Sequence, residues 1–173
     1  NLFAGTVGGG VFLSTNNGTS WSAASTGLTS FTVHAFAASG ANLFAGGDGV
    51  FLSTNNGTSW SAASTGLTNP YVNAFAVSGT NLFAGTTFGG VFLSTDNGTS
   101  WTAASTGLTI TYVRTLAVSG TNLFAGTYSG VFLSTNNGTS WTVASTGMTN
   151  TDVRTLAVSG TNLFAGTYGG VFL

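Results

Sequence analysis

A segment of the form Val-Phe-Leu-Ser-Thr-Asn-Asn-Gly-Thr-Ser-Trp returns about every 40 residues along this chain, and this period constrains the fold more than any other feature. Each repeat is a supersecondary unit that buries its apolar face against its neighbours. We therefore expect residues 1–173 to form a single repeat array. The recurring aromatic positions are Phe12, Phe51, Phe92, Phe132 and Phe172, with Trp21, Trp60, Trp101 and Trp141.

Each repeat contains four short β-forming segments separated by turns. In one repeat they span 112–118, 123–127, 131–135 and 141–145, and the turns between them contain Gly or Asn-Gly. Links this short cannot cross over to join parallel strands, so the strands must form an antiparallel meander. This pattern predicts an all-β, β-propeller-like array of about 4.5 four-stranded blades. The structural alternative, a parallel β-helix, would need shorter coils and no tight hairpins.

The two ends of the chain predict association. The chain opens with the last three strands of a repeat, over 2–25, and closes with the first three, over 152–173. Joining these ends would complete a ring of four blades and leave 162–173 as a surplus copy of 1–13. An isolated hairpin is marginally stable in water, so we expect this one to pair with something. The array is then a piece of a longer parent chain or part of a multimer or filament.

Composition restricts the partners. Charged residues make up 3% of the chain, against roughly 25% in an ordinary soluble domain. Low charge offers little resistance to self-association, and the absence of a basic patch argues against nucleic acid as a partner. The apolar runs are too short for membrane insertion. With one His and no Cys, the sequence supports no metal site, and nothing in it indicates a cofactor.

The segment 94–101, Ser-Thr-Asp-Asn-Gly-Thr-Ser-Trp, resembles the Asp-box (BNR) repeat of sialidases, sortilin-like receptors and many secreted bacterial propellers. The other three copies carry Asn at the Asp position, and Asn can make the same turn bonds. The resemblance implies a hairpin between the third and fourth strands of a propeller blade. In that family the box lies away from the catalytic centre, so it implies architecture and not activity.

The residue inventory argues against an enzyme. Resemblance to sialidases would require an arginine cluster, a Tyr–Glu nucleophile pair and an acid/base Asp, but this chain has no Glu and only two Arg. Glycoside hydrolysis normally uses two facing carboxylates. Here the three carboxylates fall at different positions of the repeat, which are Asp48, Asp96 and Asp152. The single histidine, His34, simply occupies a variable position.

Variation between repeats concentrates in two places. One is the loop between the second and third strands, and the other is the start of the first strand. In a propeller both emerge on the same face, and loops on a rigid scaffold usually carry binding, although neutral drift would give the same variation. The candidate ligand-binding residues are Tyr71, Asn73, Phe88, Tyr112, Arg114, Tyr128, Asp152 and Arg154.

Four Asn-Gly-Thr sequons recur with the repeat. They make Asn17, Asn56, Asn97 and Asn137 candidates for N-glycosylation, and a glycan on each would line up on one face. The demands of the turn explain the same residues without any glycan, and we favour that explanation.

These observations predict a non-catalytic extracellular or cell-surface module with a structural or adhesion role. The alternative function is a lectin that binds sugars through exposed aromatic rings and polar groups on the variable face.

Overall fold

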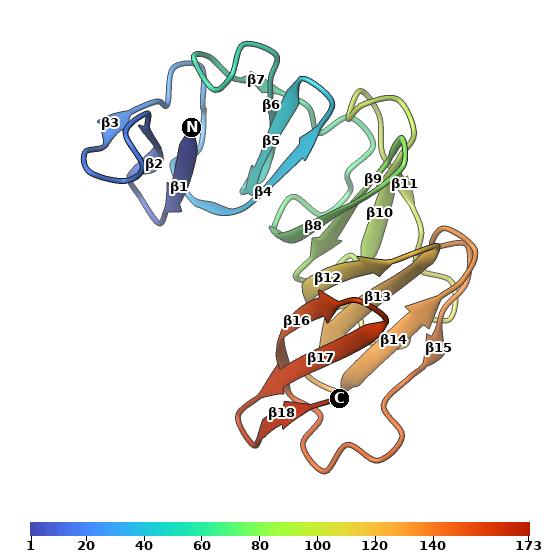
Figure 1. Ribbon diagram of the computed structural model, residues 1–173. Helices are drawn as coiled ribbons and strands as arrows, with labels where there is room; N and C mark the ends of the chain where they lie inside the picture. The colour runs from blue at the N-terminus through green and yellow to red at the C-terminus, as the bar shows by residue number, and fades with distance from the viewer.

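The computed structural model describes residues 1–173, and all of its regular secondary structure is β-strand. Its 18 strands form five antiparallel sheets in chain order, which follow one another along an open arc with the termini at opposite ends (Figure 1). The predicted all-β fold of antiparallel blades is confirmed, and the parallel β-helix is wrong. No part of the chain forms an apolar helix long enough to cross a bilayer.

The three central sheets each have four strands, and the two terminal sheets have three. The first sheet comprises β1 (Leu2–Thr6), β2 (Gly10–Ser14) and β3 (Ser22–Ala23). The second comprises β4 (Val33–Ser39), β5 (Asn42–Gly47), β6 (Gly49–Ser53) and β7 (Ser61–Ala62). The third comprises β8 (Val72–Ser78), β9 (Asn81–Thr86), β10 (Val91–Ser94) and β11 (Thr102–Ala103). The fourth comprises β12 (Val113–Ser119), β13 (Asn122–Thr127), β14 (Gly130–Ser134) and β15 (Thr142–Val143). The fifth comprises β16 (Val153–Ser159), β17 (Asn162–Thr167) and β18 (Gly170–Phe172).

The fourth strand of each repeat is shorter than the sequence predicts. We expected it over 141–145, but β15 covers only Thr142–Val143. The reason is that both flanks make other bonds. On one side, the Trp141 main-chain N–H donates to Thr106 O, in the turn that follows β11 of the preceding repeat, at 2.9 Å. On the other side, Ser145 Oγ accepts a bond from the N–H of Val131 and caps the neighbouring strand.

Each complete first strand carries a β-bulge near its start. In β12, for example, Val113 pairs with Thr127 and Thr115 pairs with Gly126, so Arg114 is an extra residue without a partner in the ladder. A bulge re-aims the side chain of the extra residue. The same position in β4, β8 and β16 holds His34, Asn73 and Arg154.

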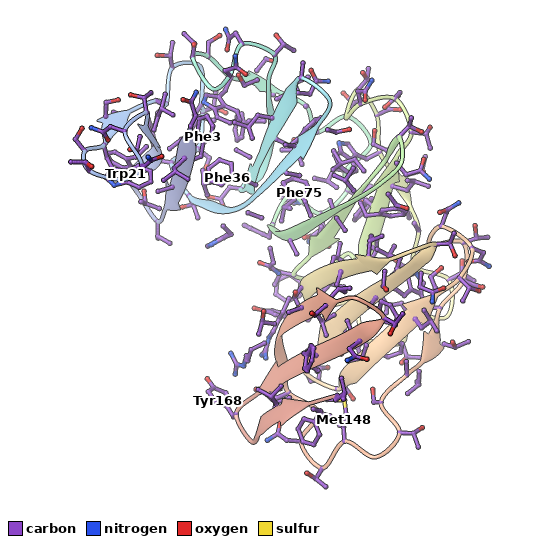
Figure 2. All side chains as sticks on the ribbon, viewed as in Figure 1. Phe3, Trp21, Phe36, Phe75, Met148 and Tyr168 are labelled. Carbon is purple, nitrogen blue, oxygen red and sulfur yellow. The ribbon has the colours of Figure 1, made fainter.

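Neighbouring sheets pack through the recurring aromatic residues. Phe51, Phe92 and Phe132 are buried, as are Trp60, Trp101 and Trp141. These side chains belong to three core clusters that run across the sheet boundaries, together with residues such as Val113 and Leu123. The expected packing of the Phe and Trp positions between blades is therefore confirmed for the central sheets. Figure 2 shows Phe36 and Phe75 in this inter-sheet space.

The turn between the third and fourth strands is held by a side-chain network. Ser94 Oγ donates to Asp96 Oδ1 and accepts from the N–H of Gly98, both at 2.8 Å. Asp96 in turn accepts from the N–H and the hydroxyl of Ser100, at 2.9 and 2.6 Å. These bonds, led by that of the Ser100 hydroxyl, lower the pKa of Asp96 to about 2. Asn16, Asn55 and Asn136 make the equivalent turn in the other repeats.

The two ends of the chain are not joined. The strand β16 pairs with β17 of its own chain, and β1–β3 remains a separate sheet. The four-blade ring that the sequence allowed is therefore not formed in this structure. Trp21 of the first sheet is 44% exposed, whereas the tryptophans of the central sheets are 3–5% exposed.

Candidate functional site

Two sets of loops share one face of the array. The loops between the second and third strands bond to the connections that lead into the next repeat. For example, the N–H of Gly49 donates to Pro70 O at 2.8 Å, and the N–H of Gly90 donates to Thr111 O at 3.0 Å. We call the surface that these loops and connections form the loop face.

Most of the charge of the protein lies on the loop face. Of the five charged side chains, four are at this face, which are Asp48, Arg114, Asp152 and Arg154. Asp96 lies in the turn at the other end of the strands. In a chain with so little charge, this concentration distinguishes the loop face from the rest of the surface.

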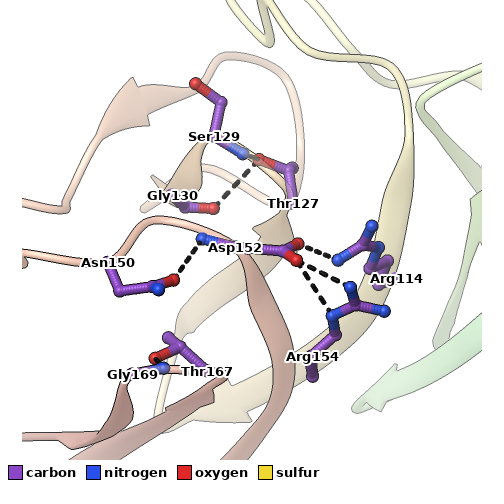
Figure 3. Close-up of polar contacts among 9 residues, drawn as sticks. All are labelled: Arg114, Thr127, Ser129, Gly130, Asn150, Asp152, Arg154, Thr167 and Gly169. Atoms are coloured by element: carbon purple, nitrogen blue, oxygen red, sulfur yellow. Dashed lines mark hydrogen bonds and ion pairs between the residues drawn. The ribbon is translucent and has the colours of Figure 1, made fainter.

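Three of the predicted residues form an ionic cluster that joins two sheets (Figure 3). Arg114 Nη1 on β12 donates to Asp152 Oδ1, just before β16. Arg154 donates to Asp152 Oδ2 through Nε at 3.1 Å and Nη2 at 2.7 Å. Desolvation raises the pKa of Asp152, but the bonds and charges of Arg154 and Arg114 outweigh it, so the pKa lies below its usual value. The main-chain N–H of Asp152 also donates to Asn150 Oδ1 at 3.1 Å.

An aromatic cluster lies beside the ionic one. The ring of Tyr112 makes edge contacts with Phe88 and Tyr128, with centroids 6.3 and 6.5 Å apart. The guanidinium of Arg114 lies over Tyr112, 5.3 Å from its ring centre. Phe88 and Tyr128 are 68% and 51% exposed, so much of their ring surface faces solvent. The structure thus brings together six of the eight predicted ligand-binding residues.

The other two predicted residues lie outside this group. Asn73, at the bulge of β8, donates from Nδ2 to Val113 O at 2.9 Å and to Thr87 Oγ1 at 3.2 Å. The side-chain amide of Asn73 therefore links the sheet of β8 to the sheet of β12. Tyr71 pairs with Asp48 as an isolated β-bridge, and its exposed ring makes no aromatic pair.

Sequence reasoning missed two residues of the loop face. Tyr168 is 77% exposed, and Arg154 lies over its ring at 4.1 Å from the centre. Tyr168 occupies the same loop position as Tyr128, so the repeat alignment could have identified it. Asn69 was also missed, and its buried Oδ1 has no hydrogen-bond partner. No sequence signal marks that atom, because its burial depends on the loop at Gly89 that packs against it.

The four sequon asparagines lie in the turns at the opposite face. They are Asn17, Asn56, Asn97 and Asn137. All four are exposed, and their φ angles lie between 55° and 57°. The glycine after each donates its N–H to the turn serine, as Gly98 does to Ser94 at 2.8 Å. The turn itself therefore accounts for Asn-Gly, while the exposure leaves the side-chain amides accessible.

The carboxylates are not arranged in a facing pair. Asp48 accepts from Ser30 Oγ at 3.0 Å, Asp152 is held by two arginines, and Asp96 is engaged in its turn. No group of three or more His, Cys, Asp or Glu side chains is placed to hold a metal ion.

Comparison with solved structures finds β-propeller-type proteins. An ancestral GH74 enzyme matches 94% of this chain with a TM-score of 0.76 and 23% identity. The extracellular domain of BT4673 from B. thetaiotaomicron matches 98% with a TM-score of 0.80 and 16% identity. YCF48 bound to D1 peptide matches 98% with a TM-score of 0.75 and 17% identity. No protein-family model and no curated protein sequence matches the chain.

These likenesses concern the fold, because all are below 25% identity. This chain covers 25% of the GH74 enzyme, 25% of the BT4673 domain and 58% of YCF48. The class that the fold defines is therefore a β-propeller-type module. The matched proteins include both enzymes and proteins not described as enzymes, so the fold alone decides no activity.

Proposed function

We propose that this chain is a non-catalytic module of an extracellular or cell-surface protein, with an adhesion or structural role, that binds its partner through the loop face and self-associates. The observation that carries this proposal is the concentration of charged and exposed aromatic side chains on one face of an otherwise repetitive scaffold. A rigid scaffold with one variable face is the usual arrangement of a binding module. The Asp-box-like turns of the opposite face then serve architecture.

The state of the carboxylates supports a role without catalysis. A general acid needs a carboxyl group whose pKa is raised, but Asp152 is held ionised by two arginines. Asp96 is also held ionised, and it lies at the other end of the strands. The extracellular location is supported by the likeness to an extracellular domain and by the exposed sequons.

Binding to immobilised extracellular-matrix proteins and to a glycan array tests this proposal. We expect protein binding that Phe88→Ala and Tyr128→Ala abolish. Val143→Ala is the matched control, because Val143 is similarly exposed at 67% but lies on the fourth strand β15. Binding that is equally sensitive to Val143→Ala would contradict a role for the loop face.

The second candidate function is a lectin. It is favoured by the grouping of Phe88, Tyr112 and Tyr128 with the guanidinium groups of Arg114 and Arg154. Aromatic faces beside directed hydrogen-bond donors suit sugar rings. The glycan array separates the two functions, because selective sugar binding lost in Tyr128→Ala supports the lectin.

A further inference from the structure

The dipeptide Asn-Gly occurs four times in the chain, and each copy lies in the turn between the third and fourth strands of a repeat. The copies begin at Asn17, Asn56, Asn97 and Asn137. In a flexible chain this is the pair in which asparagine loses its amide most readily, because glycine has no Cβ to hinder its main-chain nitrogen. The same chemical change therefore threatens the same turn in every repeat.

The reaction joins the main-chain nitrogen of the glycine to Cγ of the asparagine. The new N–Cγ bond closes a succinimide ring, and the amide nitrogen leaves as ammonia with the proton that the glycine nitrogen gives up. Water then opens the ring at either carbonyl, which produces aspartate or isoaspartate. Isoaspartate carries the main chain through its side-chain carbon, so the turn gains an additional main-chain atom.

The main-chain conformation of these asparagines keeps the reacting atoms apart. Their φ angles of 55° to 57° lie in the left-handed helical region, where ψ is about +47°. Ring closure requires the glycine nitrogen to lie on the same side of the Cα–C bond as Cβ. At this ψ the nitrogen lies nearly opposite Cβ, so rotation of the side chain alone cannot bring Cγ to it. The turn must therefore open before the ring can close.

The serine of each turn opposes the reaction in a second way. Gly57, Gly98 and Gly138 donate their main-chain N–H to the serine four residues before them, at 2.8 or 2.9 Å. The hydroxyl proton of that serine is already donated to the Asp or Asn two residues on, as Ser94 donates to Asp96. The serine oxygen therefore offers only lone pairs to the glycine nitrogen, and these disfavour the loss of its proton. A glycine nitrogen that keeps its proton is a poor nucleophile.

Packing between repeats holds the glycine of the turn in place, while the asparagine itself stays open to water. The sequon asparagines are exposed, so shielding of their amides from solvent does not protect them. The glycines that follow in the central repeats are buried. A Cβ on Gly98 would collide with the ring of Phe44 in the preceding repeat, and one on Gly138 would lie 3.2 Å from the ring of Phe83. Opening a turn therefore means separating it from the repeat before it.

We propose that Asn56, Asn97 and Asn137 are latent deamidation sites, which the folded turn protects and which react with water when their turn opens. The serine of each turn is the residue that controls the reaction. Stacked repeats contact only their neighbours and open locally, so each turn is protected separately. Because isoaspartate cannot restore the turn, each event leaves a permanent record of one opening. This inference concerns the face opposite the loop face and goes beyond the proposed function.

Peptide mapping by mass spectrometry tests the proposal on the whole 173-residue chain, incubated at neutral pH in isotopically labelled water. The label enters the new carboxylate when water opens the ring, so it reports only events that occur during the incubation. In urea, where the chain is unfolded, we expect labelling at Asn56, Asn97 and Asn137. In the folded protein we expect no labelling at these sites over the same period. Equal rates in the two states would refute protection by the turn, and this comparison needs no variant.

A serine substitution tests which residue controls the reaction. Ser94→Ala removes the acceptor of the Gly98 N–H and should raise the labelling rate of Asn97 roughly tenfold, because an opening then breaks one hydrogen bond fewer. The other two asparagines should keep their rates. Ser105→Ala is the matched control, because Ser105 lies in the same repeat and accepts from the Val91 N–H at 2.8 Å, outside the turn. It should leave all three rates unchanged.

Comparison of the sites within one molecule separates a local effect from a general loss of stability. Ser134→Ala should transfer the acceleration to Asn137 alone. Acceleration at all three sites in Ser94→Ala, or an equal effect of Ser105→Ala, would show that overall stability and not the turn serine sets the rate. Neither result would bear on the loop-face assays.

Discussion

At the scale of single residues, one position of the repeat shows how the same turn is made with different chemistry. Asp96 and the asparagines at its position accept the same main-chain bond from the serine four residues on. The carboxylate differs because it can be protonated and then loses acceptor capacity. Acid therefore acts on one turn of the array and leaves the other three unaffected.

The acid sensitivity of this turn gives a prediction. Because folding lowers the pKa of Asp96 from 3.8 to about 2, its contribution to stability is present above pH 4 and is lost as the pH falls toward 2. We expect Asp96→Asn to flatten the fall of the urea midpoint between pH 4 and pH 2. Asp48→Asn is the control for simple removal of a carboxylate. Parallel curves for Asp96→Asn and the parent protein would contradict the prediction.

A second prediction at this scale concerns the hydrogen bond that Trp101 Nε1 donates to Ala63 O of the preceding repeat, at 2.8 Å. Trp101→Phe keeps an aromatic ring but leaves the carbonyl of Ala63 without its donor, and such a loss costs about 1–3 kcal/mol. Trp21→Phe should cost almost nothing, because Trp21 is 44% exposed and its indole makes no hydrogen bond. Chemical denaturation measures both. Equal losses in the two variants would show that ring size, and not the hydrogen bond, stabilises the site.

At the scale of strands, the bulge decides what the variable residues do. The extra residue of the first strand is free of the ladder, so its side chain can reach the next repeat, as those of Asn73 and Arg114 do. The variable position thus contributes to contacts between sheets as well as to the loop face. Change at this position alters how tightly two sheets are held while their cores stay the same.

The bulge gives a third prediction. Asn73→Ala removes the bond to Val113 O and should lower the free energy of unfolding by about 0.5–1.5 kcal/mol. His34→Ala is its matched control, because His34 occupies the same bulge position but is exposed and makes no side-chain bond. The difference between the two unfolding midpoints measures the inter-sheet bond. If His34→Ala destabilises as much as Asn73→Ala, the bulge residue acts through the strand and not through its neighbour.

The same scale separates what the sequence could predict from what it could not. The strands of the repeat were predictable because Gly and Asn-Gly mark every turn, as at Gly120 and Gly138. The bulge was not, because the register of Val113 and Thr115 depends on pairing with another strand. The cluster around Asp152 was only partly predictable. The variable positions indicated its residues, but the bond of Asp152 to Arg114 spans neighbouring repeats and depends on their packing.

At the scale of the whole molecule, the array separates two surfaces with different roles. The turns of one face are nearly identical in every repeat, whereas the loop face carries the variation, most of the charge and the exposed rings. Stacked repeats contact only their neighbours, so a change at one loop does not propagate through the scaffold. This arrangement is the one that the proposed binding role requires.

A prediction about activity belongs to this scale. The chain should show no turnover of sialosides or of aryl glycosides, because its carboxylates lie apart and Asp152 is paired with two arginines. Asp152→Asn should therefore leave the background rate of these assays unchanged. Turnover above that background, lost in Asp152→Asn, would show that the loop face is catalytic.

The tryptophan interface has a consequence for how the protein can change in length. Trp60, Trp101 and Trp141 each donate from Nε1 and from the main-chain N–H to carbonyl oxygens of the repeat before, and the residues on both sides recur at these three junctions. Removing residues 60–100 would place Trp101 directly after Ser59. Ala24 O and Thr26 O would then accept from the indole and main-chain N–H groups of Trp101 the bonds that they now accept from Trp60. Loss or duplication of a whole unit therefore creates no contact that the chain does not already make. The length of the array and the number of its loops can change by whole repeats, and no new core contacts are required.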